Sequence, residues 1–497
     1  MKKRAWIAVA AASALLLSAC GGGGNDTPVD SAAQTINIGS VYEPQNLDNT
    51  AGGGQGVTEA LNGNVYEGLF TLTDTGTVEP LLATAHTASE DGLTYTFTLA
   101  DGVTFHSGKA LTSADVKASI ERVTAETSKS ARKSSLAVVK EIATPDDRTV
   151  TVTLSAPSIS FVYNLSYVWI VNTAAGDLTT TADGTGPYRL GEWKRGATLS
   201  LTRNDAYWGT KAKNAGAVFH YFTDATALNN ALLTNAVDVV TSEQSPDALA
   251  QFESNPQYKI NEGTSTTKLL LAFNDRVAPF DKVQVRKAVS AAIDNAKLLN
   301  SVWGDYGTLI GSMVPPGDPW YEDLTAVNAY DVEAAKRLLA EGGQPNGFTF
   351  TLDTPNYDPH PTAATFIKSE LAKIGVTVEI NTITSDEWYT KVYQQRDFQA
   401  TMQEHVNDRD VVWYGNPDFY WGYANATVTD LVKQAEAAKT EAAQADLLKQ
   451  ANKIIAEEAA SDWLYLYPQI VVASADLSGY PLNGRNSQFF VYDIVKS

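Results

Sequence analysis

The sequence predicts a mixed α/β protein built from several lobes. Stretches in which polar and apolar residues alternate, such as 94–99, indicate strands, and helical patterns such as 331–339 are interleaved with them. Apolar residues make up 44% of the 497 residues and charged residues 19%, a globular composition. Because a chain of this length exceeds what one ordinary hydrophobic core organises, we expect two or three lobes.

The first residues have the pattern of a secretory leader. Lys2, Lys3 and Arg4 precede an uncharged run over 5–19. This run is shorter than the roughly 20 apolar residues of a membrane-spanning helix, and it ends in small residues that suit a signal peptidase. We therefore expect residues 1–19 to be a signal peptide.

A single cysteine follows the leader directly. Cys20 is the only cysteine in the chain, and residues 17–20, Leu-Ser-Ala-Cys, resemble a bacterial lipobox, which implies that the thiol is acylated. The alternative is an uncleaved signal anchor with an incidental cysteine. The residues after Cys20 are small and polar, so 20–34 are expected to be the lipidated cysteine and a flexible tether.

The acidic balance of the chain excludes one class of partner. The formal net charge is −20. Nucleic-acid binding needs basic patches over phosphates, so no nucleic-acid partner is expected. The acidity does not identify a solute, because it more often serves solubility.

Each element is predicted from its own local pattern. Strands are expected where polar and apolar residues alternate, and helices where apolar residues recur every three or four positions. Thr112 with Asp115, and Thr384 with Glu387, have the spacing of capping boxes. The expected elements, in chain order, are strand 35–41, strand 94–99, helix 112–122, strand 148–154, helix 283–294, helix 331–339, strand 348–352, helix 361–373, strand 376–380, helix 384–393 and one or two helices over 430–459.

Several aromatic residues are expected to be core. Trp463, Tyr465 and Tyr467 alternate, so the three should share one face of a strand. Tyr167 and Trp169 invite the same interpretation.

Three consecutive segments carry a resemblance to a known family. They are EDGLTYTFTL at 90–99, GVTFHSGK at 102–109 and LTSADV at 111–116. Together with VYEGL at 65–69, GTGPY at 184–188, NDAYW at 204–208 and the residues over 273–294, they resemble family 5 extracellular solute-binding proteins. The resemblance covers about residues 35 to 480. One departure is Ala100, where the family usually has a basic residue.

The resemblance implies a fold. It is a two-lobed, periplasmic-binding-protein-like clamp of type II, with the extra subdomain of the large peptide-binding class. Lobe I would span 35–295, with 77–183 as that subdomain, and lobe II 296–469, while 470–497 would return to lobe I. Gly184 and Gly186 would mark the return from the subdomain, because glycine reaches backbone angles closed to other residues.

The resemblance also implies a function and partners. The chain would be the solute-binding lipoprotein of an ABC importer, capturing a di- or oligopeptide between its lobes and delivering it to permease subunits that work with ATPase subunits. It would be a monomer attached to the extracytoplasmic face of the cell membrane, or periplasmic, without catalysis and without a cofactor.

Two segments supply candidate ligand contacts. The first follows the strand at 35–41 and offers Tyr42, Glu43 and Asn46, as the family's cleft-lining segment does. The alternative is a plain loop of turn residues.

The second candidate segment is acidic and aromatic. In peptide-binding relatives a carboxylate in this position meets the ligand ammonium, so Asp408 or Asp410 is expected to do so, and the spacing does not choose between them. Arg409 could pair with a solute carboxylate or with its neighbouring aspartates. Trp413 and Trp421 could stack on side chains or sugar rings, or belong to the core.

Other function classes find less support in the sequence. It contains no Gly-x-Ser-x-Gly elbow and no phosphate-binding loop, which leaves a surface lipoprotein hydrolase as a weak alternative. An oligosaccharide or a metal chelate remains open as the solute. The five histidines lack the spacing of a metal site, so no bound metal is expected; they are His86, His106, His220, His360 and His405.

Overall fold

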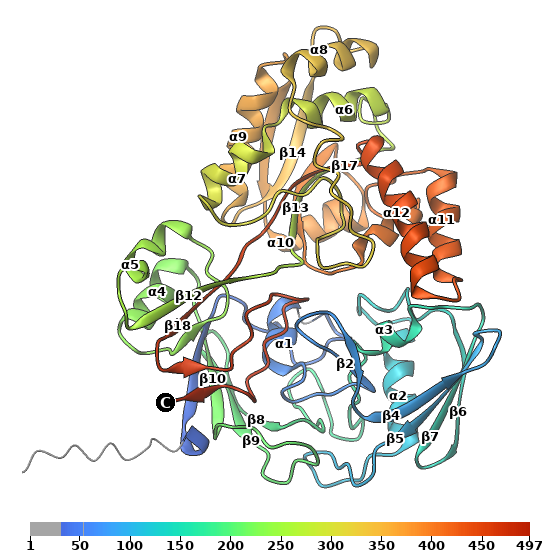
Figure 1. The fold of residues 1–497 in the computed structure, drawn as a ribbon, viewed down its shortest axis with the longest axis vertical. Coiled ribbons are helices and arrows are strands. Elements are labelled where there is room, and N and C mark those ends of the chain that lie inside the picture. The colour runs from blue at the N-terminus through green and yellow to red at the C-terminus, as the bar shows by residue number, and fades with distance from the viewer. Residues whose placement is uncertain (1–30, 53) are drawn as a thin grey trace, which may run out of the picture.

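The computed structural model describes residues 31–52 and 54–497 (Figure 1). The predicted signal peptide, the predicted acylation site Cys20 and most of the predicted tether lie outside these residues. The described chain forms an upper lobe and a lower lobe, and the lower lobe widens into two parts (Figure 1). No helix among the described residues has the length and apolarity needed to cross a membrane.

A seven-stranded sheet organises one part of the lower lobe. Its order is β12 (Tyr258–Gly263), β18 (Gln469–Ser474), β11 (Val239–Val240), β1 (Thr35–Ser40), β10 (Gly216–Tyr221), β9 (Thr198–Arg203) and β8 (Tyr188–Lys194). The sheet is buried on both faces: along β18, Val471 and Ala473 pack into one hydrophobic core and Ile470 and Val472 into another. A late segment of the chain therefore completes a sheet begun by the first strand.

A four-stranded antiparallel sheet organises the other part of the lower lobe. Its order is β4 (Ala83–Ala88), β5 (Thr94–Leu99), β7 (Thr149–Leu154) and β6 (Val139–Asp146). Phe97, Val150 and Val152 point into a core shared with helix α2 (Ser113–Thr124) and the short helix α3 (Phe161–Leu165). These elements lie within 77–183, where a subdomain is expected.

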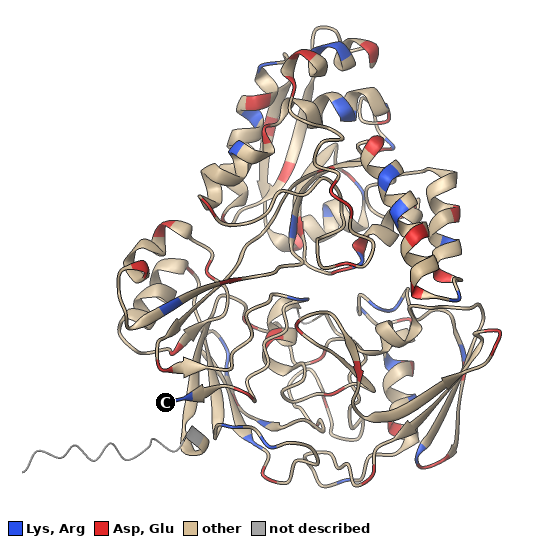
Figure 2. Cartoon of the chain, viewed as in Figure 1, with Lys and Arg blue, Asp and Glu red and all other residues tan. Residues whose placement is uncertain are grey.

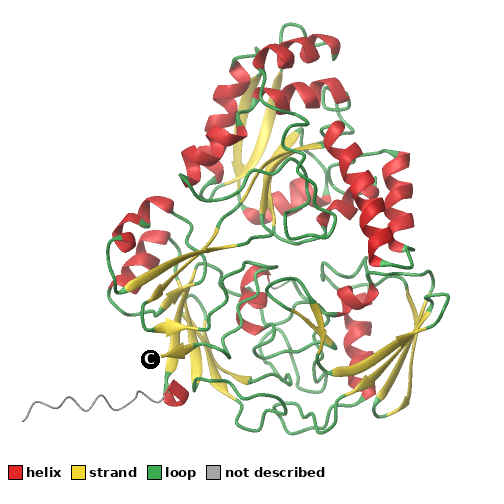
Figure 3. Ribbon diagram, in the orientation of Figure 1, coloured by secondary structure: helices red, strands yellow, loops and turns green. Residues whose placement is uncertain are grey.

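The upper lobe has a five-stranded sheet with helices on both sides (Figure 3). Its order is β15 (Thr377–Ile383), β14 (Thr349–Pro355), β16 (Ala400–His405), β13 (Lys268–Phe273) and β17 (Ser461–Leu466). One face packs on α6 (Val283–Ala292), α7 (Asn295–Trp303), α8 (Val332–Glu341) and α9 (His360–Ala372), and the other on α11 (Ala426–Glu436) and α12 (Glu441–Glu457). Lys, Arg, Asp and Glu are interspersed along the outer helices of this lobe (Figure 2).

The remaining elements are short. They are η1 (Ser31–Ala33), α1 (Gly54–Leu61), β2 (Phe70–Leu72), β3 (Val78–Pro80), α4 (Ala225–Leu233), η2 (Pro246–Ala248), α5 (Ala250–Glu253), α10 (Ser385–Trp388), η3 (Tyr389–Gln394), η4 (Asp410–Gly415), β19 (Leu477–Ser478) and β20 (Val495–Lys496).

The passage between the lobes comes earlier in the chain than we predicted. Strand β13 and helix α6 precede residue 296, yet both belong to the sheet and core of the upper lobe. The chain crosses from β12 to β13 and returns from β17 to β18, and these two crossings run side by side (Figure 1). Residue 296, where the resemblance placed the boundary, lies in α7, where one helix of the upper lobe follows another.

The strongest local signals are confirmed. Thr112 and Asp115 form the predicted capping box at the start of α2, and Thr384 and Glu387 form the one that begins α10. The helix expected over 384–393 begins as an α-helix and continues as the π-helix η3. The long helical pattern over 430–459 is two helices, α11 and α12.

The aromatic residues around β17 do not share one face. All three are buried, but Trp463 packs with Tyr414 in one core while Tyr465 and Tyr467 pack in the opposite core. The reason is a bulge: Leu269 pairs with Tyr465 and Leu270 with Trp463, which leaves Leu464 as an extra residue. One inserted residue reverses the faces of the strand that follows it.

Gly184 and Gly186 are required for close packing, not for unusual backbone angles. Neither is among the glycines with positive φ. A Cβ on Gly184 would clash with the carbonyl oxygen of Val65, and one on Gly186 would lie 2.6 Å from the carbonyl oxygen of Asn64. The segment after the subdomain therefore packs directly against the backbone at 64–65.

We expect Gly184→Ala to lower the free energy of unfolding by about 3 kcal/mol, because backbone must move to admit the methyl group. Urea denaturation followed by tryptophan fluorescence would measure it. Gly102→Ala is the control: its φ is +72° with open space around it, so only backbone strain of about 1 kcal/mol is added. Equal losses for the two variants would contradict the close packing.

Candidate functional site

The two lobes contact each other through a cluster of arginine and tyrosine side chains around Asp408. Tyr163 and Tyr167, on and just after α3 of the lower lobe, donate their hydroxyl groups to Oδ1 of Asp408 in the upper lobe. Arg485 donates to Oδ2 at 2.7 Å, and Asn486 donates to Oδ1 at 3.2 Å. The carboxylate of Asp408 is therefore surrounded by donors from two distant parts of the chain.

These contacts keep Asp408 ionised. Burial alone would raise its pKa, but the hydrogen bond from Tyr163 and the charges of Arg132, Arg485 and Arg409 outweigh burial and lower the pKa. The nearby carboxyl of Asp318 has the opposite behaviour: burial, together with the charge of Asp408, raises its pKa to about 7. At neutral pH the cluster contains more positive charge than negative charge.

Two guanidinium groups in this cluster form no direct ion pair with a described residue, although the charge of Asp408 is close to both. Arg132, from the lower lobe, stacks on the ring of Tyr167 at 3.7 Å, and Arg409, from the upper lobe, stacks on Tyr163 at 3.7 Å. Within the described residues neither guanidinium donates a hydrogen bond or forms an ion pair. Nε of Arg485 is also buried without an acceptor. We name Arg132, Arg409 and Arg485 the arginine cluster.

The backbone at Arg409 is also unusual. Its φ is 58°, in the left-handed region, and its amide donates to Oδ2 of Asp318 at 3.0 Å. A left-handed conformation costs a residue with a side chain about 1 kcal/mol or more. Such strain gathers at ligand sites, where the surrounding structure holds it in place.

Asp410 is an internal partner of the upper lobe. It is buried, and it accepts from Nζ of Lys268 at 3.2 Å and from Nε1 of Trp413 at 3.1 Å, with Nδ1 of His405 3.5 Å away. Because Lys268 is itself fully buried, removal of Asp410 would leave an unpaired buried cation, at a cost of about 3 kcal/mol or more.

We therefore revise the expectation that Asp408 or Asp410 meets a ligand ammonium. Both carboxylates already accept charged or hydroxyl donors from the protein. Arg409, the residue between them, stacks on Tyr163, and its guanidinium forms no ion pair with a described residue. A substitution of either aspartate would disturb folding as well as binding.

The two tryptophans of this segment belong to the aromatic core. Trp421 is fully buried and stacks on Tyr414 with ring centroids 4.3 Å apart. Trp413 stacks on Phe419 at 5.1 Å and donates to Asp410. We do not retain Trp421 as a ligand contact, because no face of its ring is accessible.

The three residues of the first candidate segment have different roles: one lines a cavity, and two make local hydrogen bonds. Tyr42 lines a small cavity of about 50 Å³, whose walls come from the lower lobe and from Thr267 in the crossing just before β13. Glu43 instead accepts from Trp193 and from the amide of Gly196, and Asn46 accepts from the amide of Asp48 in a turn. Only Tyr42 of the three candidates reaches the cavity. The other lining residues are Gln55, Glu59, Thr241, Ser242, Thr267, Gln469, Gly484, Ser487, Gln488 and Phe489.

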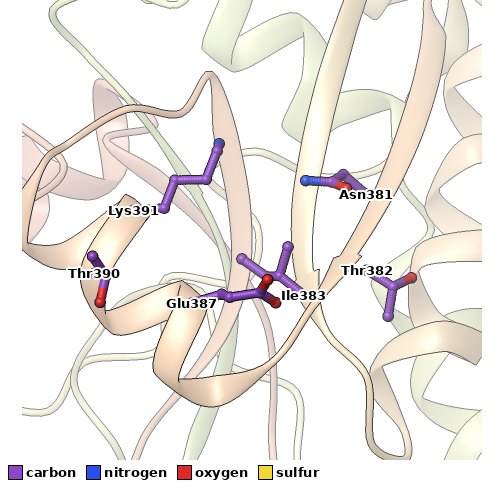
Figure 4. A pocket seen from close by; sticks show the side chains of 6 residues that line it. All are labelled: Asn381, Thr382, Ile383, Glu387, Thr390 and Lys391. Carbon is purple, nitrogen blue, oxygen red and sulfur yellow. The ribbon is translucent and has the colours of Figure 1, made fainter.

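A larger open pocket of about 400 Å³ lies on the upper lobe alone, between β15 and the helical turn that follows it (Figure 4). Its cation, Lys391, is already bound to Asp353 with an Nζ to Oδ2 distance of 2.6 Å. No group of three or more metal-binding side chains is present among residues 31–52 and 54–497. We therefore place the candidate site at the lobe boundary.

Sequence reasoning missed most of this site. Arg132 lies in a loop with no motif, and Arg485 lies near the end of the chain, where only a structural return to lobe I was expected. Tyr167 was expected to be core, yet its hydroxyl reaches Asp408. The four-residue spacing of Tyr163 and Tyr167 was the one available signal, because it places two hydroxyl groups on one side of a helical turn.

Comparisons with known proteins identify the family of this chain. Residues 77–423 match the model of the family described as bacterial extracellular solute-binding proteins, family 5 Middle. A glutathione-binding protein, GsiB of Pectobacterium atrosepticum, is 25% identical over 403 residues, which cover 78% of this chain and 74% of GsiB. Heme-binding protein A of Haemophilus influenzae is 28% identical over 380 residues, covering 69% and 67%.

Solved structures share the fold over nearly the whole chain. The PBP AgaA from A. tumefacien R10, in complex with agropinic acid, superposes with a TM-score of 0.82 at 25% identity, covering 93% of this chain and 99% of AgaA. DppA from Helicobacter pylori, in complex with the peptide STSA, gives 0.80 at 22% identity, covering 94% and 99%. The two lobes are those of a periplasmic binding protein, and the chain belongs to the bacterial extracellular solute-binding proteins of family 5.

Proposed function

We propose that this chain captures a short peptide, or a peptide-like solute that bears a carboxylate, and delivers it to an ABC permease. The observation that carries this proposal is the pair of guanidinium groups, Arg132 and Arg409, that lie at the lobe boundary without forming an ion pair or a hydrogen bond with a described residue. Acylation of Cys20 would hold the protein at the extracytoplasmic face of the membrane. Its role is binding without turnover.

Desolvation explains why these arginines favour an anion. A charged group taken out of water loses hydration that only a partner of opposite charge restores. A carboxylate accepts two parallel hydrogen bonds from one guanidinium, and such charge-assisted bonds are the stronger kind. The arginine cluster has one ionised partner, Asp408, so it can accept at least one more negative charge.

The similar proteins favour the same solute chemistry. Their names and bound ligands include glutathione, the peptide STSA and agropinic acid, which all carry carboxylates. An oligosaccharide is less favoured, because Trp421 is enclosed in the core and Trp413 already stacks on Phe419. We therefore keep a peptide as the predicted solute, and we propose that its carboxylate binds the arginine cluster.

Binding and closure would be coupled through this cluster. Arg132 belongs to the lower lobe and Arg409 to the upper lobe, so one carboxylate between them would contact both lobes. A solute shifts a conformational equilibrium only by its difference in affinity for the two states. Contacts that exist only when the lobes meet would favour the closed form, which is the form delivered to the permease.

We expect Arg132→Ala and Arg409→Ala each to weaken solute binding about 10- to 100-fold, the range of one charge-assisted hydrogen bond. A thermal-shift screen of glutathione and of free di- and tripeptides selects the test solute, and calorimetry measures Kd. Arg337→Ala, on the exposed surface of α8, is the matched control and should bind like wild type. Unchanged affinity in both cluster variants would refute the assignment.

A second contact joins the lobes away from the arginine cluster. Glu436, the last residue of α11, accepts hydrogen bonds from Ser158 and Ser160 of the lower lobe, the latter at 2.8 Å. Its carbonyl oxygen accepts from the amide of Ile159 at 2.9 Å, and Gln444 of α12 donates to Ser160 at 3.0 Å. None of these groups belongs to the cluster or the cavity, so this contact stabilises closure without touching solute.

Glu436→Ala should therefore raise Kd about 10-fold or more, because two hydrogen bonds to a charged group are lost only from the closed form. The same variant should be more open in small-angle X-ray scattering at subsaturating solute. Glu457→Ala, exposed on α12, serves as the control. A Glu436→Ala protein with wild-type affinity would mean that this contact does not influence closure.

A further inference from the structure

A pair of turns in the upper lobe lies beside the arginine cluster. Residues 315–321 connect α7 to α8. Within them the amide of Asp318 donates to the carbonyl oxygen of Pro315, and the amide of Tyr321 donates to the carbonyl oxygen of Asp318, both at 3.0 Å. In each turn the second residue is a proline, whose fixed φ suits that position. We name residues 315–321 the double turn, and it holds the backbone of Asp318 from both sides.

The double turn is anchored in the core of the upper lobe. Met313 and Val314, directly before it, are fully buried, and Trp320 within it is 2% exposed in the same core. The prolines leave the backbone little conformational freedom. The double turn therefore moves with the upper lobe and keeps its shape whether or not the lobes meet.

The double turn contacts Arg409 at two points. Oδ2 of Asp318 accepts from the amide of Arg409 at 3.0 Å, and the ring centroid of Trp320 lies 5.3 Å from the guanidinium carbon. A cation at this distance is attracted to the face of a ring. The ring of Tyr163, 3.7 Å from the same guanidinium, belongs to the lower lobe. Asp318 and Trp320 therefore stay with Arg409 when the lobes separate, whereas Tyr163 does not.

The double turn also lies against a second arginine. A Cβ on Gly317 would lie 3.0 Å from Nη2 of Arg485. That guanidinium donates to Asp408 through its other terminal nitrogen. Two of the three members of the arginine cluster are therefore next to this one segment.

The bond to Asp318 accompanies an uncommon backbone conformation. Arg409 has φ 58° and ψ 17°, in the left-handed region. With the preceding peptide held in place, a return of φ to about −60°, the common right-handed value, would turn the Cα–Cβ bond by about 120° around the N–Cα axis. The guanidinium would then leave the ring of Tyr163. The place of this charge therefore depends on what holds the backbone of Arg409.

The carboxyl group of Asp318 makes no other polar contact with the described part of the chain. Asp318 is 5% exposed, and the one hydrogen bond that its side chain accepts comes from the amide of Arg409. A carboxyl group withdrawn from water costs free energy unless its partners offset the lost hydration. This cost is met at a single position, the amide of Arg409.

We infer that Asp318 is a positioning residue for solute capture: it holds Arg409 in the left-handed conformation that directs the guanidinium to the lobe boundary. Asp318 acts through the backbone of Arg409 and not on the solute. This inference rests on the proposed function, because the position of Arg409 affects capture only if Arg409 binds the carboxylate of the solute. An arginine that is already in place loses less conformational entropy on binding, so the double turn would raise affinity by preorganisation.

Two substitutions at one position separate the acceptor from the charge. Burial and the charge of Asp408 raise the pKa of Asp318 to about 7, so at pH 6 its carboxyl is mostly uncharged. An uncharged acid still accepts a hydrogen bond, and so does the side-chain oxygen of asparagine. At pH 6, Asp318→Asn therefore keeps both the charge state and the acceptor, whereas Asp318→Ala removes the acceptor.

A measurement without ligand tests the contact itself. Hydrogen exchange, resolved to single amides by mass spectrometry, compares the amide of Arg409 in wild type and in the two variants, with the amides of β13 as a reference for the stability of the lobe. We expect exchange at Arg409 to be at least 10-fold faster in Asp318→Ala and within 2-fold of wild type in Asp318→Asn, because a bonded amide exchanges only when its bond opens. Unchanged exchange at Arg409 in Asp318→Ala would overturn the inference.

Binding is then measured by calorimetry at pH 6 with glutathione, trialanine and the free tripeptide that gives the largest thermal shift. Asp318→Ala should raise Kd about 5- to 10-fold, the range of one hydrogen bond, and Asp318→Asn should stay within 2-fold of wild type. Asp323→Ala is the matched control and should bind like wild type: Asp323 accepts from the amide of Thr325 at 3.0 Å in the same connection, outside the arginine cluster.

A double-mutant cycle distinguishes positioning from a direct or a purely structural role. If Asp318 acts through Arg409, Asp318→Ala should change Kd by less than 2-fold in the Arg409→Ala background. Independent, multiplying losses of affinity from the two substitutions would overturn the inference, and so would wild-type affinity of Asp318→Ala beside weak binding by Arg409→Ala.

Failure of the proposed function has a different signature. Wild-type affinity in both Arg132→Ala and Arg409→Ala, or no response to any peptide of the screen, would refute the proposed function and with it the role of Asp318 in capture. Hydrogen exchange at Arg409 would still show whether Asp318 holds this residue in place.

Discussion

The guanidinium groups of Arg132 and Arg409 approach the ring of Tyr163 from different lobes, and neither forms an ion pair or a hydrogen bond with a described residue. Both side chains are partly exposed, and a charge partly withdrawn from water without a bonded partner still loses hydration. The protein limits this cost by stacking the guanidinium groups on aromatic rings, an interaction worth roughly 1 kcal/mol at such sites. The stacking orients the arginines but leaves their donors free, which is what a binding site for a carboxylate requires.

The other polar groups of the lobe boundary can be understood from this constraint. Asp408 holds Arg485, Tyr163 and Tyr167 in one arrangement, and so fixes the surface on which Arg132 and Arg409 stack. A cleft whose arginines form no ion pair gains more from closing around a carboxylate than from closing empty. Selectivity and closure then have the same physical origin.

Local structure was predictable because it depends on neighbouring residues. The alternation at 94–99, the capping box at Thr112 and the one at Thr384 each determine a strand or a helix end from a few adjacent side chains. The faces of β17 were not predictable, since a bulge at Leu464 depends on the partner strand β13. The prediction of the lobe boundary was wrong for a similar reason. The sequence of β13 is that of any buried strand, and only its pairing with β16 and β17 assigns it to the sheet of the upper lobe.

The candidate site was predictable in its location but not in its chemistry. The segment 408–410 was recognised, and Arg409 was considered as a partner for a solute carboxylate. The aspartates on either side were preferred as ligand contacts because nothing local shows that Lys268 and Arg485, more than 70 residues away in the chain, already neutralise them. Long-range pairing of charges decides which groups remain available to a ligand.

Identification of the solute would test the central claim most directly. Mass spectrometry of the small molecules that wild-type protein retains from a bacterial extract, compared with those retained by the Arg132→Ala, Arg409→Ala double variant, would reveal which compound depends on the arginine pair. The account predicts a compound with at least one carboxylate that is retained by wild type and lost from the variant. Retention of a neutral solute by both proteins would contradict it.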